Sequence, residues 1–166
     1  ARPAKPSIER WMPRGRTRPG ASGTVVDMLN RILSSAAAWA ALGLASGLYW
    51  RELTKLNDFT GDTSLSTAHT HALSLGMLVL LTVLALAKAF ALPERPTKLF
   101  VLLWNVGVGL TFGTMVVKGS LQVLGVAFAT SPMLRGFAGL GHMLLAGSLV
   151  YLFLILRRAL RAPAAQ

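Results

Sequence analysis

Three histidines are the residues of this chain that combine metal-ligand chemistry with a place inside long apolar segments. His69 and His71 lie near the start of one apolar run, in the sequence Thr-Ala-His-Thr-His-Ala, and His142 lies near the start of another. Neutral imidazole is a ligand for haem iron, zinc and copper. A polar side chain inside a bilayer is costly and by default marks a functional position. We therefore treat the three histidines as the candidate site.

The spacing of His69 and His71 limits what the pair can do. Successive residues of an α-helix are rotated by about 100°, so the two rings point about 200° apart. One helix cannot direct both rings at the same metal ion. The two histidines therefore need two different partners.

Four apolar segments must position these histidines. The 166-residue chain is 53% hydrophobic and only 14% charged, whereas a soluble domain has about a quarter charged residues. A helix needs roughly 20 apolar residues to cross a hydrocarbon core, and helices satisfy their own backbone hydrogen bonds in lipid. The segments, which contain no Asp, Glu, Lys or Arg, are residues 32–50, 65–87, 99–117 and 136–156.

These segments predict an all-α fold, an integral membrane four-helix bundle in the lipid bilayer. The bundle is expected over residues 28–158, between a disordered basic tail at 1–27 and a short basic tail at 159–166. The net charge of +11 is unevenly distributed, because thirteen of the seventeen Lys and Arg residues lie before span one, between spans two and three, or after span four. The side rich in Lys and Arg is cytoplasmic, so both termini are expected in the cytoplasm. This distribution favours a membrane over nucleic acid as the partner, and the absence of cysteine excludes thiolate ligands.

The predicted topology brings the histidines to one depth. Spans two and four both run from the outside inward, which places His69, His71 and His142 about 6–9 Å below the outer boundary at 1.5 Å per residue. Parallel helices with histidines at matching depth can hold a planar cofactor between two imidazoles, and haem b is such a cofactor. The sequence leaves open which two of the three histidines pair.

Basic residues at the outer ends of the spans extend the candidate site. Charge-assisted hydrogen bonds from these residues would hold haem propionates that face outward, although ordinary interfacial snorkelling explains them equally well. The residues are Arg51, Lys118 and Arg135.

The same histidines also fit two roles that do not involve haem. Zinc or copper could bind them, although the spans supply no carboxylate or thiol to complete such a site. The rings could instead form only hydrogen bonds between helices. Two small-xxx-small patterns, Gly43/Gly47 and Gly109/Gly113, predict close helix packing in spans one and three.

Several short motifs together resemble an uncharacterised bacterial family of four-span membrane proteins, a domain of unknown function. They are Tyr-Trp-Arg-Glu-Leu-Thr-Lys at 49–55, Phe-Thr-Gly at 59–61, His-Thr-His at 69–71 and Gly-Leu-Gly-His at 139–142. The resemblance covers residues 28–158. It implies a multi-pass protein of the bacterial plasma membrane and supplies no activity.

A looser resemblance is to the catalytic subunit of haem-copper oxidases and to haem-containing membrane proteins of the nitric oxide response. That oxidase subunit has twelve helices in three arcs of four, with His-x-His or a single His near the outer side of the second helix of an arc, and His69-Thr-His71 is similar. The resemblance implies haem ligation. Span three lacks the histidine pair that would hold copper, and His142 has no counterpart in the oxidase.

These observations predict a b-type haem protein that transfers electrons, through an unknown redox partner, or senses redox state or a diatomic gas. The alternative is a non-enzymatic membrane subunit, an assembly factor or a small channel. No catalytic residues are evident, and whether the protein is an enzyme is left open. Because one of His69 and His71 would turn away from the centre of an isolated bundle, at a cost of about a few kcal/mol, the sequence also predicts a homo-oligomer. A trimer would reproduce the twelve-helix layout, and a dimer is the alternative.

Overall fold

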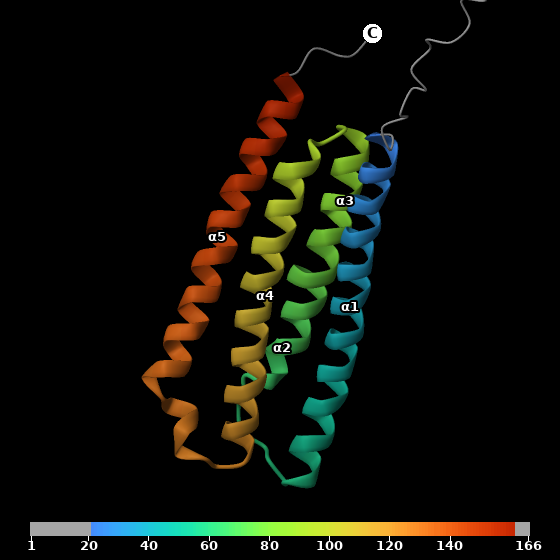
Figure 1. Cartoon of the computed structure of the whole chain (residues 1–166). Coiled ribbons are helices and arrows are strands. Elements are labelled where there is room, and N and C mark those ends of the chain that lie inside the picture. The colour runs from blue at the N-terminus through green and yellow to red at the C-terminus, as the bar shows by residue number, and fades with distance from the viewer. Residues whose placement is uncertain (1–20, 162–166) are drawn as a thin grey trace, which may run out of the picture.

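The computed structural model describes residues 21–161, with side chains from Val25 onward, and this part of the chain is helical apart from short loops (Figure 1). This confirms the predicted all-α fold. Of the predicted tails at 1–27 and 159–166, residues 1–20 and 162–166 lie outside the described residues, whereas 21–27 and 159–161 are helical, not disordered as predicted for the first tail. The elements in order are α1 (Ala21–Leu56), α2 (Leu65–His71), the π-helix η1 (Ala72–Leu78), α3 (Val79–Ala89), α4 (Glu94–Val123), the 3₁₀ helix η2 (Ala127–Thr130) and α5 (Pro132–Arg161).

The elements α2, η1 and α3 follow one another without a break, so residues 65–89 form one span that crosses the molecule once. With α1, α4 and α5 this makes four helices in the described range that are long and apolar enough to cross a membrane. Large apolar side chains are exposed on all of these spans, including Leu44, Leu81, Leu102 and Phe153. Such an exterior is what a hydrocarbon solvent requires, and it indicates a multi-pass membrane protein.

The helices form a four-helix bundle with one peripheral member. α1 packs along the whole of the second span and also contacts α4, while α2 and η1 contact α4 on another side. α5 packs extensively on α4 and lies at the edge of the bundle (Figure 1). The core residues that hold the first three spans together include Met28, Ile32, Trp39, Leu80, Val83, Phe100 and Trp104.

Buried hydroxyl groups on the spans are satisfied by carbonyls of their own helices, whereas Thr63, in the loop before α2, donates to the carbonyl of Gly119 on α4 over 2.9 Å. Thr111 donates to the carbonyl of Gly107 over 3.0 Å, and Ser148 donates to the carbonyl of Leu144 over 2.7 Å. An unpaired polar group would cost several kcal/mol in an apolar interior. These local hydrogen bonds allow polar side chains at helix contacts without a partner from another helix.

Glycines set the closest helix approaches, although only one of the two predicted patterns takes part. Gly43 and Gly47 face the second span, since a Cβ on Gly43 would lie 2.7 Å from Leu73 and a Cβ on Gly47 would lie 3.6 Å from His69. The prediction for Gly109 and Gly113 is wrong within the chain, because a Cβ at either position would meet nothing within 4 Å. The close contacts of α4 use other glycines, above all Gly119, where a Cβ would lie 2.4 Å from the backbone nitrogen of Leu65.

Replacing Gly119 by alanine is therefore expected to destabilise the fold. The clash is with backbone, which cannot move away as the end of a side chain could, and overpacking of this kind costs about 1–3 kcal/mol. Gly147→Ala in α5 is the matched control, because a Cβ there meets nothing within 4 Å and alanine favours a helix interior by about 0.5–1 kcal/mol. Thermal unfolding in detergent, followed by circular dichroism, should show a lower midpoint for Gly119→Ala only. Equal midpoints for the two variants would contradict the packing described here.

Candidate functional site

His69 lies against α1. Its ring stacks on the indole of Trp50, with ring centroids 5.8 Å apart and planes inclined by 9°. The ring is half-buried, and its Nδ1 atom is buried without a hydrogen-bond partner among residues 21–161. A pocket of about 500 Å³ beside it is lined by Gly47, Trp50, Arg51, Thr54 and His69. His69 thus forms part of the contact between the first two spans.

His71 is held by a bond within its own helix. Its Nδ1 lies 3.0 Å from the backbone carbonyl oxygen of Thr67, one turn earlier. A carbonyl can only accept, so Nδ1 carries a proton, and in the neutral ring Nε2 presents a lone pair. No residue within 21–161 hydrogen-bonds this Nε2. The half-buried ring therefore offers an oriented, unprotonated nitrogen.

His142 repeats this arrangement on α5. Its Nδ1 lies 2.8 Å from the backbone carbonyl oxygen of Ala138, again one turn earlier. The same reasoning assigns the proton to Nδ1 and leaves Nε2 as an acceptor with no partner in the described part of the chain. The ring is exposed at the surface of the single chain. Metal-bound histidines are commonly fixed in this way, with the non-ligating nitrogen bonded to a backbone carbonyl.

The helix α4 shows how the levels of His71 and His142 compare. Leu65, at the start of α2, lies against Gly119, so His71 lies at about the level of residue 113 in this antiparallel helix. Gly141 lies against Thr111 and Gly107, which places His142 near the level of residue 109. The two rings differ in level by about one helical turn, roughly 5 Å. They come from two parallel helices that both pack on α4.

The π-helix η1 begins directly after His71. π-helical turns inside α-helices are rare and are frequent at functional sites. Here the widened helix presents the carbonyl oxygen of Leu75 to α4, where the indole nitrogen of Trp104 donates to it over 2.8 Å. This bond fixes the second span against α4 one turn after His71.

The three basic residues predicted for the site lie at the same end of the bundle as the histidines. Arg51 is exposed near the end of α1 and is 3.7 Å from Glu52. Lys118 is half-buried in the last part of α4, and Arg135 is exposed in the first turn of α5. Neither Lys118 nor Arg135 has an ion-pair partner among residues 21–161. Their position leaves them available to an anionic group near the loops.

The histidines do not form a metal site by themselves. Within residues 21–161, no group of three or more His, Cys, Asp or Glu side chains is placed to hold a metal ion. The expectation of hydrogen bonds between helices is also not met in the described chain, because each ring hydrogen-bonds only within its own helix. The partners are Thr70 for His69, over 3.4 Å, Thr67 for His71 and Ala138 for His142.

Three features of the site were not predicted from the sequence. The stacking of Trp50 on His69 joins residues whose contact depends on the crossing of two helices. The carbonyl partners Thr67 and Ala138 could have been found, since a histidine in a helix can reach the residue four positions earlier. The π-helix has no signal in the apolar pattern of residues 72–78.

Comparison with known proteins gives one match. The profile of a family described as "Protein of unknown function (DUF2871)" matches residues 29–159, which is most of the chain. This agrees with the predicted four-span family over residues 28–158. No curated protein and no solved structure matches the chain.

Proposed function

The chain belongs to the DUF2871 family of proteins of unknown function, and we propose that it is a membrane b-type haem protein with His71 and His142 as axial ligands. The observation that carries the proposal is the shared state of these two rings. Each donates from Nδ1 to a backbone carbonyl and presents an unpartnered Nε2. The optical spectrum of the purified protein, with histidine variants, is the test.

The donor set fits haem better than zinc or copper. Haem needs only two axial nitrogens from the protein, whereas a protein-only zinc or copper site needs three or more ligands. Two oriented imidazoles are present, and the described residues contain no group of three or more His, Cys, Asp or Glu side chains placed to hold a metal ion. When bound, haem supplies one-electron chemistry or a binding site for a diatomic gas.

The surrounding residues have separate roles in this proposal. The carbonyls of Thr67 and Ala138 fix the ring orientation and raise the basicity of Nε2. Arg51, Lys118 and Arg135 would bind the propionate carboxylates near the loops. His69 is assigned to the helix contact with Trp50 rather than to the iron. Electron transfer or sensing of redox state or a gas is the function that follows.

The alternative, a structural subunit, assembly factor or small channel, receives less support. That interpretation requires histidines that only join helices by hydrogen bonds. In the described chain each ring bonds within its own helix instead.

We place the loops that contain Asn57 and Val126 outside a bacterial plasma membrane and both termini in the cytoplasm, because Lys and Arg are concentrated at the termini. The chain has no cysteine, so single-cysteine variants report the topology directly. Asn57→Cys and Val126→Cys should react with an impermeant maleimide added to whole cells, and Arg161→Cys should not. The reverse pattern would invert the orientation.

The proposal includes a homo-oligomer, with a trimer favoured over a dimer. Two surfaces support it: the exposed ring of His142 on α5, and the side of α4 at Gly109 and Gly113, where a Cβ would meet nothing within 4 Å among the described residues. Small residues permit close approach of helices from a second chain. Burial of the histidine at such a contact would remove the cost of an imidazole facing lipid.

Native mass spectrometry in mild detergent is expected to show the oligomer.

Co-expression of two variants shows whether neighbouring chains share the haem. When His71→Ala and His142→Ala chains are produced in the same cell, they should regain haem if His71 of one chain and His142 of its neighbour form one site. No recovery would place both ligands in the same chain. A stable monomer with full haem content would contradict the oligomer.

A further inference from the structure

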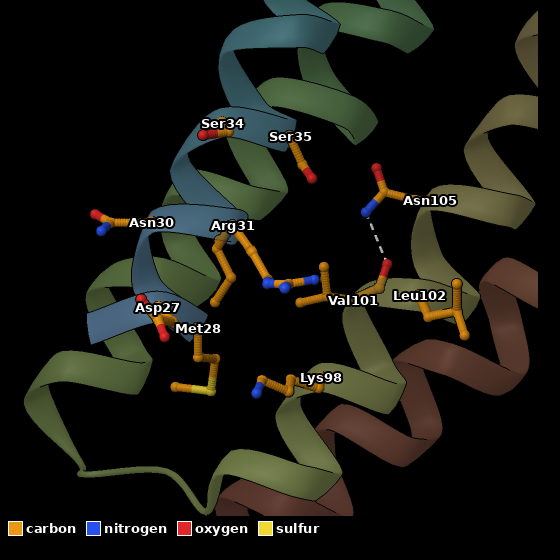
Figure 2. A pocket seen from close by; sticks show the side chains of 11 residues that line it. Asp27, Met28, Asn30, Arg31, Ser34, Ser35, Lys98, Val101, Leu102 and Asn105 are labelled. Carbon is orange, nitrogen blue, oxygen red and sulfur yellow. Dashed lines mark hydrogen bonds between the residues drawn. The ribbon is translucent and has the colours of Figure 1, made fainter. Parts of the chain in front are cut away.

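A cavity of about 880 Å³ lies between α1 and α4 (Figure 2), near the start of both helices and therefore at the end of the bundle opposite to the histidines. Its lining is mixed, with charged, amide and hydroxyl side chains beside apolar ones. The residues used below are Asp27, Arg31, Ser35, Lys98, Leu102 and Asn105. No step of the haem proposal involves this cavity.

Two cations point into the cavity from opposite walls. Figure 2 shows the guanidinium of Arg31 reaching from α1 toward α4, and the ammonium of Lys98 entering the same space from α4. Lys98 pairs with Glu94. Arg31 has no ion-pair partner within residues 21–161, and Asp27, the one carboxylate of the lining, forms an ion pair with neither cation. The guanidinium of Arg31 is thus free of a direct ion pair with the described protein.

The depth of the two cations matches that of lipid headgroups. Arg31 directly precedes the apolar run 32–50, and Lys98 directly precedes the run 99–117. Both side chains therefore lie at the boundary of the hydrocarbon core, where lipid phosphates are found. The headgroups of the adjacent leaflet would lie at this depth beside the two helices.

The walls of the cavity are fixed and carry further donors. The indole nitrogen of Trp39 donates to the Oδ1 atom of Asn105 over 2.7 Å, which ties α1 to α4 at one end of the cavity. The hydroxyl of Ser35 has no hydrogen-bond partner among residues 21–161 and lines the same space. Leu102, which is 60% exposed, extends the lining toward the lipid-facing surface.

We propose that this cavity binds the phosphate of an anionic phospholipid from the leaflet on the side of the termini. The Arg31 guanidinium would hold two phosphate oxygens with its planar fork. Lys98, which is paired with Glu94, would donate a further hydrogen bond, and Ser35 would donate another. An acyl chain would run along Leu102. Basic pockets between membrane helices are the usual place for such headgroups.

Native mass spectrometry of the full chain in mild detergent tests this proposal. The chain is titrated with phosphatidylglycerol and, separately, with phosphatidylcholine that carries the same acyl chains. Phosphatidylglycerol is expected to bind about tenfold more tightly, because phosphatidylcholine carries a quaternary ammonium beside the same phosphate and so has no net negative charge for Arg31 to attract. Arg31→Gln should remove this preference. Arg158→Gln, a cation exposed near the same end on α5, should leave it unchanged.

Equal binding of the two lipids to the unmodified chain would overturn the proposal. An equal loss of the preference in Arg31→Gln and Arg158→Gln would also overturn it, because it would show a general effect of charge. Arg31→Lys keeps the charge without the fork and should weaken binding partly, so it serves as the test if Arg31→Gln does not fold. Inorganic phosphate at millimolar concentration should not displace the lipid. Displacement by phosphate would assign the cavity to the free ion instead.

Discussion

Replacing either His71 or His142 by alanine is expected to abolish the haem spectrum, while His69→Ala keeps it. The first two rings present a free Nε2, and the third is engaged with Trp50. Loss of a group that hydrogen-bonds to a metal ligand typically lowers metal affinity by about 10–100-fold. Loss of the ligand itself should therefore lower haem affinity by more than about 100-fold. Haem content per chain, measured in the purified variants, checks this expectation.

His69→Ala is the internal control for this experiment, because it removes an imidazole from the same helix as His71. Circular dichroism should show that all three variants remain helical. Added imidazole should restore part of the spectrum in His71→Ala and His142→Ala, as it can occupy the space that the ring has left. Full haem content in either of these variants would remove that residue from the ligand pair.

Enlarging Gly139, which lies beside His142, is expected to have the second-largest effect on haem affinity. Gly139 lies one turn before His142, and a Cβ there meets nothing within 4 Å in the described chain. Gly139→Leu should therefore fold normally and still occupy the space next to the ligand that the cofactor needs. Overpacking costs about 1–3 kcal/mol, so haem affinity should fall by about tenfold or more.

Gly147→Leu provides the matched control for Gly139→Leu. This position is also open and on the same helix, but it is rotated from His142 by about 140°. Both variants gain the same side chain and the same helix propensity, so a difference in haem content reports the position alone. Equal haem content in the two variants would show that the cofactor does not lie beside Gly139.

The four spans could be predicted from the sequence because a hydrocarbon core demands unbroken apolar runs of a fixed length. The helices extend past these runs at most ends, for example from 99–117 to Glu94–Val123. Many of the extra residues are polar or charged, so they lower the mean hydropathy and are not recognised as part of an apolar run. The first helix likewise starts at Ala21, upstream of the expected boundary at residue 28.

The packing of the spans could not be predicted in the same way. A helix in lipid is apolar on all sides, so its composition does not tell which face meets another helix. The two glycine patterns show this directly: Gly43 and Gly47 pack against the second span, whereas a Cβ on Gly109 or Gly113 would meet nothing within 4 Å among the described residues. The position of α5 at the edge of the bundle is equally invisible in the sequence.

The candidate site was predictable in its residues and only partly in its geometry. The rotation per residue separated His69 from His71, and the contact of His69 with α1 agrees with that separation. The oligomer was predicted on the assumption that one of these two rings would point away from the bundle and have no protein neighbours within the chain. Trp50 and Gly47 supply surroundings for His69 within the chain, and the exposed ring is instead His142 on α5.

The optical spectrum of the full-length protein, expressed with ample haem and purified in mild detergent, tests the haem proposal most directly. Two imidazole ligands predict a Soret band in the oxidised protein and sharp α and β bands after reduction with dithionite. The molar ratio of haem to protein chain should equal the number of haem sites per chain. A colourless protein that stays colourless when titrated with haem would contradict the proposal.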